Sequence, residues 1–578
     1  MSIIDKEDAR FFKRVMVLII LLVISLSYLA YDKSISYSRY ERIEYQSSGA
    51  TLYANLYYPS KNLGFQEQRP LIIYCHGIGS QRDFDLRIPI EFTKRGFFVA
   101  ALDYQGHGES SGNIINIDPT TDIPALAQDC SKLLDKLETL PFYSNVNISQ
   151  IGLIGHSLGG MVVLMNQALD PRFNVTVAWA PLVNFDPQQL GIVSTDNYDP
   201  YIPVNLLNKT NTNNLLIIMH VNDEALDFTN QALVAQNLTD CMVIPISGFL
   251  FGGGHQLFSD VVLIESIKWF ENYFFKSETI NGPINITFLV NYFVIFIILL
   301  LLVLIVLSLI SYTSKFLSVK KDIIQKNSIK NDVPISKIKV KAKKLKQILK
   351  IIFYTTIFLL NWEIFERIFG LVGIFLASLN ISIIFFAVRL VYYLGDLKEK
   401  RVKFDIHQFK ELIKSQFQLK YFVYAILSNV YFIVIYLIFS FSYPFAFMWP
   451  SNFFNSVLAA GVAFPIYFSM EILYRKVLYP KLNFLKDERK KALWIILIAI
   501  YVQINLMTLT WSWAFFPSVM FMYLIFLYAI IQNTLIYENT KRFSTLILSS
   551  FVIIQLFFAA VISNAIGIGA VLHLFVKI

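Results

Sequence analysis

The chain has 578 residues, of which 55% are hydrophobic, and its mean hydropathy is +0.52. One hydrophobic core does not serve a chain of this length, and so apolar a composition excludes a wholly soluble protein. We therefore expect several domains, one of them embedded in a membrane. The net charge of +9 does not indicate nucleic-acid binding, because the lysines cluster beside apolar segments, as membrane topology requires.

The N-terminal segment has the pattern of a membrane anchor. Residues 1–14 carry four basic side chains, whereas residues 15–31 are apolar and uncharged. We interpret the first as a cytoplasmic tail and the second as a transmembrane signal anchor. A cleaved signal peptide is the competing interpretation, but Tyr28-Leu29-Ala30 is a poor small-x-small cleavage site. Seventeen residues are near the lower limit for a span.

Residues 32–286 are less apolar and alternate strand-like with helix-like segments. A hairpin is expected around Ser48-Gly49, and residues 123–140 have helical spacing. Apolar runs typical of buried strands follow at 71–75, 97–102, 151–155, 175–179, 215–219 and 242–246. This alternation predicts an α/β domain with a mostly parallel sheet and helices on both faces. Residues 182–213 form a long connection that could act as a small lid.

The segment Gly155-His156-Ser157-Leu158-Gly159 joins an apolar strand to a helix-like stretch. A nucleophilic serine on such a sharp turn has little room beside it, so glycines on either side suit the geometry. The amide of Leu158 follows at a helix N-terminus, where it can face a developing oxyanion. Because glycine–serine turns before helices are common, the motif indicates a nucleophile only together with a later acid and histidine.

Four places together resemble the α/β-hydrolase (serine hydrolase) fold family over about residues 40–276. They are the turn at Ser157, His76-Gly77 after a strand, the strand end at residues 215–224, and the glycine-rich loop 252–258. Their order supplies serine, acid and histidine as the family does. The resemblance implies a catalytic triad of Ser157, Asp223 and His255.

The same resemblance implies an oxyanion hole formed by the amides of Ile78 and Leu158. Two carboxylates compete for the acid, because the loop after the strand is one residue shorter than the family pattern. We favour Asp223 over Glu224, since the following residues continue the family pattern from Asp223. In the structural alternatives, Asp223 caps a helix near Leu226, and the histidine is an ordinary loop residue.

Other polar residues near these motifs have structural interpretations. Three of them resemble a family turn with backbone roles: Asp103, Gly106 and Gly108. Three histidines neighbour the site without an evident partner: His107, His156 and His220. No spacing of metal ligands recurs, so we expect neither a metal nor a cofactor. The three cysteines form no paired framework, and Cys75 and Cys241 are predicted to be buried thiols.

The membrane half begins with a strong predicted transmembrane helix at residues 287–311. The following segment, residues 312–350, contains twelve lysines and is cytoplasmic by the positive-inside rule, which places residues 32–286 outside. Possible glycosylation sequons agree, although each can arise by chance; they are Asn147, Asn174, Asn208, Asn237 and Asn285.

The remainder, residues 351–578, is predicted to be an all-α polytopic transmembrane domain. Seven further spans are expected at 350–369, 371–392, 421–441, 454–474, 492–509, 514–536 and 543–564. With the two earlier spans this makes nine. The uncharged turn near Pro444 to Pro450 would face outside.

One intramembrane segment, Met470-Glu471 to Arg475, weakly resembles the Glu-Glu-x-x-x-Arg segment of the CAAX-protease and bacteriocin-processing (CPBP) intramembrane proteases. Met470 replaces the first glutamate, and no histidine occurs in the later spans before His573. The resemblance therefore implies a scaffold without the family's complete set of residues. The alternative is an interfacial Glu–Arg pair that ends a helix.

Taken together, the motifs predict a serine hydrolase in the cell membrane with its catalytic domain outside the cytoplasm. It would cleave an ester, thioester or amide in an acyl-containing small molecule, lipid or peptide, with membrane lipid as a further partner. One alternative is a serine peptidase of the same fold. Another is a ligand-binding or transport-associated membrane protein with a non-catalytic hydrolase-like domain, which loss of a triad residue would favour; all three are present.

Overall fold

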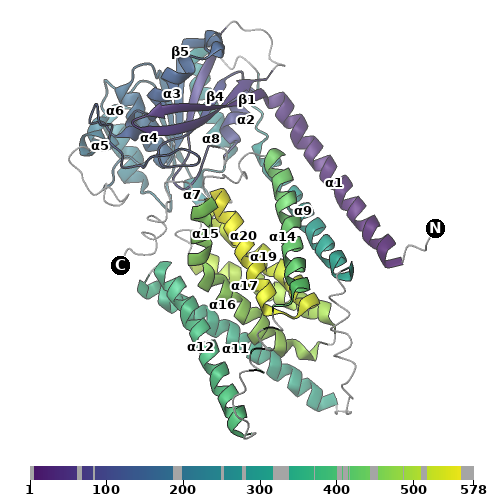
Figure 1. The fold of residues 1–578 in the computed structure, drawn as a ribbon. Helices are drawn as coiled ribbons and strands as arrows, with labels where there is room; N and C mark the ends of the chain where they lie inside the picture. The colour runs from purple at the N-terminus through teal and green to yellow at the C-terminus, as the bar shows by residue number, and fades with distance from the viewer. Residues whose placement is uncertain are drawn as a thin grey trace.

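The computed structural model has an α/β domain and a long helical part that extends from one side of it (Figure 1). The described residues are 6–60, 68–82, 85–186, 198–248, 253–275, 282–316, 337–369, 371–399, 407, 410, 414, 417–442, 453–485, 487–509 and 517–561. Four features of the sequence analysis lie wholly or partly outside the described residues. They are most of the predicted basic loop, the middle of the predicted lid, the turn near Pro444, and His573.

The α/β domain is built on one eight-stranded sheet with the order β1-β2-β4-β3-β5-β6-β7-β8. The strands are β1 (Tyr37–Ser47), β2 (Ala50–Pro59), β3 (Arg69–Cys75), β4 (Phe98–Asp103), β5 (Val146–His156), β6 (Val175–Trp179), β7 (Leu215–His220) and β8 (Met242–Ile246). The first two pair antiparallel, as does β2 with β4, and the remaining neighbours are parallel. The predicted α/β class and the hairpin at Ser48-Gly49 are confirmed.

Helices cover both faces of this sheet, which explains why its central strands are apolar without alternation. They are α2 (Arg87–Thr93), α3 (Asp129–Glu138), α4 (Leu158–Leu169), α5 (Pro203–Leu206), α6 (Val234–Thr239), α7 (Gly253–Gln256) and α8 (Asp260–Phe275). Every residue of β4 and β7 is buried. The helical spacing predicted over 123–140 is split into a short 3₁₀ turn (Ala125–Ala127) and α3.

The helical part consists of long helices that run away from the α/β domain (Figure 1). They are α1 (Lys6–Ser36), α9 (Phe288–Phe316), α11 (Lys337–Phe369), α12 (Leu371–Glu399), α14 (Leu419–Ser442), α15 (Phe453–Val462), α16 (Phe464–Glu471), α17 (Glu488–Leu509), α19 (Pro517–Thr540) and α20 (Phe543–Val561). Within the described residues, five helices are long and apolar enough to cross a membrane: α1, α9, α11, α12 and α17. The other predicted spans stay predictions.

One predicted span is not a single straight helix. Within residues 454–474, which were predicted as a span, the chain bends by 50° between α15 and α16. Pro465 lies in the first turn of α16. Because proline lacks an N–H and crowds the preceding turn, it suits the start of a new helix better than a helix interior. The span predicted at 454–474 therefore stays a prediction, with a bend before Pro465.

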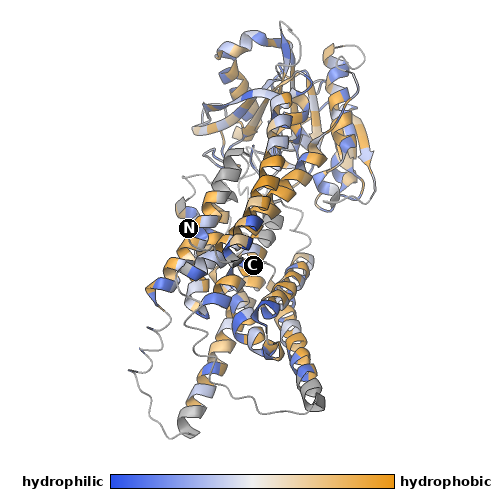
Figure 2. Cartoon of the chain, turned by 90° about the vertical axis from the view of Figure 1, so that its right-hand side faces the viewer, coloured by the Kyte–Doolittle hydropathy of each residue, from blue (hydrophilic) through white to orange (hydrophobic). Residues whose placement is uncertain are grey.

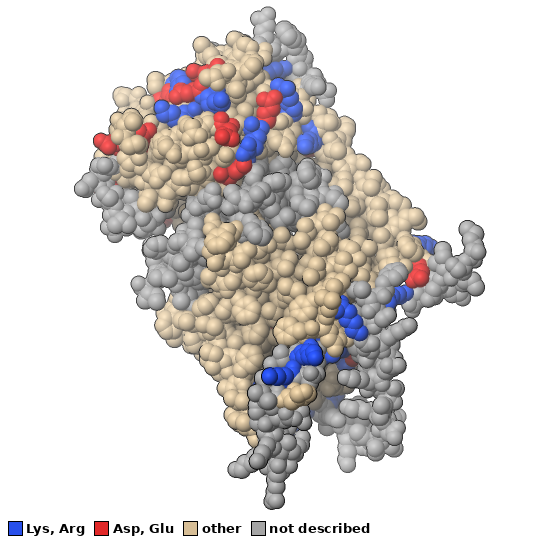
Figure 3. Space-filling view, viewed as in Figure 1, with Lys and Arg blue, Asp and Glu red and all other residues tan. Residues whose placement is uncertain are grey.

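Apolar and charged residues separate along the length of the molecule. Hydrophobic residues dominate the helices next to the α/β domain in Figure 2. On the face drawn in Figure 3, charged side chains gather on the α/β domain and at the far end of the helices, with an uncharged surface between them. Helices α1 and α9 pack against each other through Leu29, Ile295, Ile298 and Leu302. This distribution agrees with membrane association by composition.

The pair Glu471–Arg475 lies inside the helical bundle. Arg475 Nε donates to Glu471 Oε2 (3.1 Å), and Asn533 Nδ2 donates to Glu471 Oε1 (2.7 Å). Glu471 is 1% exposed and Arg475 is fully buried. The helices around Glu471 and Arg475 thus enclose both charges, and Glu471 is the last residue of α16. The alternative of an interfacial pair stays a prediction.

Candidate active site

Ser157 lies on a strained turn between β5 and α4. Its φ of 56° and ψ of −118° are unusual for a residue with a side chain, and its N–H donates to the carbonyl of Trp179 (2.8 Å). The flanking glycines are required by space: a Cβ on Gly155 would lie 2.2 Å from the Gly159 oxygen, and one on Gly159 would lie 2.3 Å from the Cys75 oxygen. The predicted strand–turn–helix is present, and its spacing follows from this crowding.

Three side chains converge at this turn. Ser157 comes from the end of β5, Asp223 from the loop after β7, and His255 from the short helix α7. The Ser157 Oγ and His255 Nε2 atoms are 3.0 Å apart, and His255 Nδ1 lies 2.9 Å from Asp223 Oδ2. Both distances are in the range of hydrogen bonds, so the serine, the histidine and the carboxylate form one continuous chain.

The two candidate acids contact His255 in different ways. The Asp223 carboxylate faces the ring, whereas Glu224 Oε2 accepts the backbone N–H of His255 (3.1 Å). Asp223 Oδ1 also accepts the N–H groups of Ala225 (2.8 Å) and Leu226 (2.9 Å). Asp223 therefore does both things that the sequence suggested. Its carboxylate caps the following turn, and the same carboxylate faces the imidazole of His255.

The predicted oxyanion turn packs directly against the serine. A Cβ on Gly77 would lie 3.0 Å from His156 Nδ1 and 3.4 Å from Ser157 Cβ. Ile78, the next residue, lines the same pocket as Ser157. Leu158 is the first residue of α4, where N–H groups have no partner within the helix and carry partial positive charge. Both predicted amides thus come from segments that border the nucleophile.

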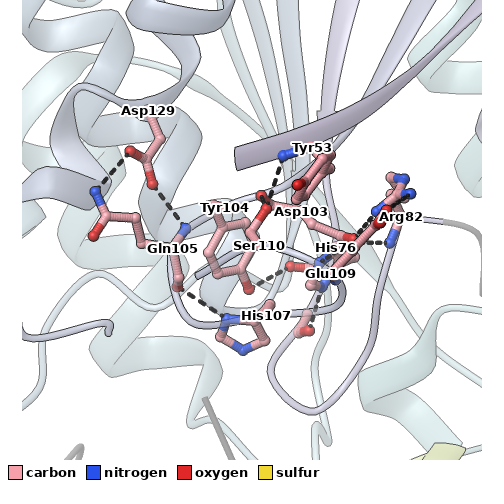
Figure 4. A network of polar contacts seen from close by, with 11 residues as sticks. Tyr53, His76, Arg82, Asp103, Tyr104, Gln105, His107, Glu109, Ser110 and Asp129 are labelled. Carbon is pink, nitrogen blue, oxygen red and sulfur yellow. Dashed lines mark hydrogen bonds and ion pairs between the residues drawn. The ribbon is translucent and has the colours of Figure 1, made fainter. Parts of the chain in front are cut away.

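A buried polar network holds the His76-Gly77 turn from behind (Figure 4). His76 Nε2 lies 3.4 Å from Asp103 Oδ1, and Tyr104 Oη donates to the His76 carbonyl (2.8 Å). Asp103 is also paired with Arg82, whose Nη2 donates to Glu109 Oε2 (2.8 Å). Burial alone would raise the pKa of Asp103, but the charge of Arg82 and the contact with His76 lower it to about 2.

The turn around Gly106 and Gly108 has the backbone role that the sequence suggested. Both glycines have positive φ, and a Cβ on Gly108 would collide with the Asp103 carboxylate. Ser110 Oγ accepts the N–H of Tyr53 (2.9 Å), which ties this turn to β2 (Figure 4). The turn therefore supports the network behind the site and contributes no side chain to the Ser157 pocket among its described lining residues.

The three neighbouring histidines have partners that sequence reasoning did not identify. His156 Nε2 lies 2.8 Å from the carbonyl of His255, to which it can donate when protonated at that nitrogen. His220 Nε2 lies 3.0 Å from the Gly248 carbonyl. Burial lowers the pKa of His107 and of His156 to about 3, so both are neutral near pH 7. His156 therefore positions the histidine loop as an uncharged group.

Arg87 has no marked signal in the sequence, yet it holds the loop that carries His255. Its Nη1 donates to the Leu257 carbonyl (3.0 Å), and its Nη2 donates to Asp85 Oδ2 (2.6 Å). The guanidinium lies 4.5 Å from the centroid of the Phe258 ring. Arg87, a residue of α2, thus contacts Leu257 and Phe258, which follow His255 closely in the chain.

A pocket opens in front of Ser157. Its lining includes Ile78, Ser80, Asp85, His156, Ser157, His255, Phe258 and Tyr292. In the part of the chain that the structure describes, no group of three or more His, Cys, Asp or Glu side chains is arranged to hold a metal. The cysteines Cys75, Cys130 and Cys241 are buried free thiols. The chemistry available in the pocket is therefore that of serine, imidazole, carboxylate and backbone amides.

Residues 66–228 match a family model described as serine aminopeptidase, S33. The chain is 25% identical over 172 residues to platelet-activating factor acetylhydrolase of Cavia porcellus, a match that covers 22% of this chain and 39% of that protein. It is 34% identical over 113 residues to an uncharacterized 31.7 kDa protein of Escherichia coli, covering 19% and 37%. The chain thus spans less than two fifths of these curated relatives.

Among solved structures, acetyl xylan esterase 1 from Thermoanaerobacterium is 18% identical, with a TM-score of 0.31 and coverage of 44% of this chain and 93% of that one. The sheet order and the strand–serine–helix turn at Ser157, together with the family match over residues 66–228, show that the α/β domain has the α/β-hydrolase fold.

Proposed function

We propose that the chain is a membrane-anchored serine hydrolase that cleaves an acyl bond with Ser157 as nucleophile, His255 as general base and Asp223 as the orienting acid. The observation that supports it is the hydrogen-bonded sequence of side chains: 3.0 Å from Ser157 Oγ to His255 Nε2 and 2.9 Å from His255 Nδ1 to Asp223 Oδ2. A serine hydroxyl becomes a useful nucleophile when a base that is itself oriented can take its proton.

In the first half of the reaction, Ser157 Oγ attacks the substrate carbonyl while His255 Nε2 accepts the hydroxyl proton. Asp223 keeps the other ring nitrogen protonated and stabilises the imidazolium that forms. The amides of Ile78 and Leu158 donate to the oxyanion, and removing one such donor typically slows a hydrolase by about 10²–10³-fold. His255 then gives the proton to the leaving group.

In the second half, water attacks the acyl-serine with His255 again as base, and the free acid departs. This chemistry accepts esters, thioesters and amides alike, so the lining of the pocket must choose among them. Among its described lining residues, the one carboxylate besides the triad is Asp85, which is held by Arg87 through 2.6–2.9 Å contacts. A carboxylate already neutralised in this way suits uncharged acyl groups.

A fluorophosphonate probe tests the nucleophile. We expect the full-length protein in membranes to be labelled, and Ser157→Ala to abolish labelling. Ser80 lies in the same pocket and offers a matched control, because Ser80→Ala should retain labelling. Labelling that persists in Ser157→Ala, or that never occurs in the wild type, would remove Ser157 as the nucleophile.

A serine peptidase is the second candidate, and the match to a serine aminopeptidase model favours it. An aminopeptidase must also bind the substrate's free ammonium group, for which a free carboxylate is the usual partner. The two activities are separated by comparing an aminoacyl coumarin amide with an acyl ester of similar size. Faster cleavage of the amide, dependent on its free amino group, would establish the peptidase.

The proposed arrangement in the membrane has six parts. They are a cytoplasmic tail (1–14), a signal anchor (15–31), the extracytoplasmic hydrolase domain (32–286), a transmembrane helix (287–311), a basic cytoplasmic loop (312–350) and a polytopic domain (351–578). In support, the start of α1 meets the end of α9, as antiparallel spans require. Lys315 Nζ lies 3.2 Å from Asp8 Oδ1, and the rings of Phe11 and Tyr312 stack at 4.0 Å.

Protease added to intact cells tests the orientation. We expect degradation of residues 32–286, while an epitope placed at residue 1 stays protected until the cells are opened. Protection of the hydrolase domain in intact cells would reverse the topology, without bearing on the role of Ser157.

A further inference from the structure

The pocket in front of Ser157 is walled in part by the helix that follows the α/β domain. Its lining includes Phe258, two residues after the end of α7, and Tyr292 of α9. The Tyr292 and Phe258 rings meet edge to face, with centroids 6.0 Å apart. Helix α9 is therefore both a candidate membrane span and a wall of the pocket.

The position of Tyr292 along α9 shows how far the pocket lies from the start of this candidate span. Tyr292 is four residues from Phe288, the first residue of the helix, which corresponds to about 6 Å at 1.5 Å per residue. Helix α9 is the most apolar of the five candidate spans in the described residues. Tyrosines are enriched where a membrane span reaches the membrane–water interface. With α9 as a membrane span, Tyr292 and the pocket that it lines would lie near this interface.

Buried contacts fix this junction to the α/β domain. Asn291 Nδ2 donates to Asp32 Oδ2 at the end of α1 (2.8 Å), and the Thr287 N–H donates to Glu91 Oε1 of α2 (2.9 Å). Phe288 is 2% exposed and belongs to the core of the α/β domain. These hydrogen bonds and the core packing hold the start of α9, and with it Tyr292, in a fixed position against the α/β domain.

The wall of the pocket also has an apolar part, which an alkyl chain can contact. Phe258 and Tyr292 present aromatic surface, and Arg87 is already engaged by Asp85 and by the Leu257 carbonyl. An acyl chain that rises from the membrane would meet these rings before its carbonyl reaches the serine. Burying each methylene of such a chain contributes about 0.8 kcal/mol.

We propose that the substrates are amphiphilic acyl esters resident in the adjoining membrane leaflet, whose acyl chains enter the pocket past Tyr292 and Phe258. This proposal rests on the proposed function, with Ser157 as nucleophile. A bond forms between Ser157 Oγ and the acyl carbon as the bond from that carbon to the leaving alcohol breaks, and His255 passes the serine proton to the departing oxygen. Water then cleaves the acyl-serine, releasing the fatty acid and restoring the hydroxyl.

The test uses the full-length protein in vesicles of a dialkyl ether phosphocholine, which contain no acyl ester of their own. Two substrates are compared: p-nitrophenyl palmitate dissolved in the vesicle membrane and water-soluble p-nitrophenyl acetate. We expect the palmitate rate to follow its mole fraction in the membrane at constant bulk concentration. A palmitate rate that follows only the bulk concentration would overturn the proposal.

A variant pair tests the wall itself. Tyr292→Ala should lower the ratio of kcat/KM for palmitate over acetate about tenfold, whereas Phe293→Ala should leave the ratio unchanged. Phe293 is the next residue of the same helix, is 63% exposed, and does not line the described pocket. An equal loss for both substrates in Tyr292→Ala would make Tyr292 a structural residue and contradict the proposal.

Fluorophosphonate labelling of the same vesicles separates this proposal from the one on which it rests. If Ser157 is labelled but palmitate hydrolysis lacks the expected dependence on mole fraction and on Tyr292, the membrane substrate is wrong and the hydrolase stands. If Ser157 is not labelled, the proposed function itself fails.

Discussion

Two buried polar clusters, one in each half of the molecule, differ in what their side chains face. At Ser157, the hydroxyl and the imidazole of His255 border a pocket. At Glu471, the carboxylate accepts from Asn533 and Arg475, and Arg475 also donates to the Ile530 carbonyl (2.9 Å). The second cluster is enclosed by helices, and none of its residues lines the Ser157 pocket.

The comparison shows that a buried charged side chain is evidence for a catalytic role only where a substrate can reach it. Both clusters carry motifs that resemble enzyme families, and the pair Glu471–Arg475 is more deeply buried in the protein than Ser157 and His255. Ion pairs in such surroundings need several partners merely to offset the loss of hydration. We therefore interpret the Glu471 cluster as one that stabilises the packing of the helical bundle. Four predictions test the contrast with the Ser157 cluster.

The largest effect is expected at the triad acid. Asp223→Asn should lower kcat by about 10⁴-fold, because an amide cannot hold His255 in the tautomer that accepts the serine proton. Glu224→Gln is the matched control, since Glu224 contacts only the backbone N–H of His255 among the hydrogen bonds described for it, and it should lose less than about tenfold. Steady-state hydrolysis of an acyl ester measures both. The reverse order would make Glu224 the acid.

In the membrane half, the expected loss is in stability. Arg475→Met leaves the Glu471 carboxylate without its cation and should destabilise the fold by about 3–5 kcal/mol. The double variant with Glu471→Leu should recover most of that loss, because an apolar pair needs no partner. Thermal unfolding in detergent measures both, with the rate of Ser157 labelling below the unfolding temperature as a control. A slower labelling rate in the folded double variant would link this cluster to the active site.

A smaller effect is expected from Arg87, which positions the histidine loop and does not touch the serine. Arg87→Lys keeps the charge but loses the planar fork that contacts Asp85 and the Leu257 carbonyl together. We expect kcat to fall by roughly 10-fold with little change in KM, since His255 is displaced while the rest of the pocket stays. A change confined to KM would instead place Arg87 in substrate binding.

The smallest effect concerns pH. Burial holds the pKa of His156 at about 3, below its ordinary value of 6.5, so the unfolded chain binds a proton there while the folded chain does not. This histidine therefore contributes stability above pH 6.5 that is lost as the pH falls from 6.5 toward 3. His156→Gln keeps a donor for the His255 carbonyl and cannot be charged. Unfolding temperatures of the variant should fall less between pH 7 and pH 5, and an identical slope would contradict this assignment.

The sequence predicted those site residues that lie within a short motif, where neighbouring residues in the chain form a recognisable pattern. Ser157 with its glycines, and His255 after its glycines, are recognisable because strand ends and turns need particular residues at fixed spacing. The sheet followed for the same reason, since fully buried parallel strands are apolar throughout. The roles of the triad residues stay predictions until the probe experiment is done.

The residues that were missed act across long distances in the sequence. Arg87 contacts the Leu257 carbonyl 170 residues later, and nothing around Arg87 in the chain marks it. Tyr292 was one apolar residue among many in a predicted span, and only the packing of α9 against Phe258 places it at the pocket. The bend before Pro465 was not predicted, because a hydrophobic run alone does not show where a helix bends.

The contact between Asn291 and Asp32 joins the helix that enters the hydrolase domain to the helix that leaves it. The α/β domain is thus inserted between α1 and α9, two helices that pack against each other. Domains whose ends lie side by side can be excised or exchanged with little disturbance to their host. Replacing residues 37–286 by a short turn should leave α1 and α9 paired, which makes this junction a natural place for grafting other domains onto the same pair of helices.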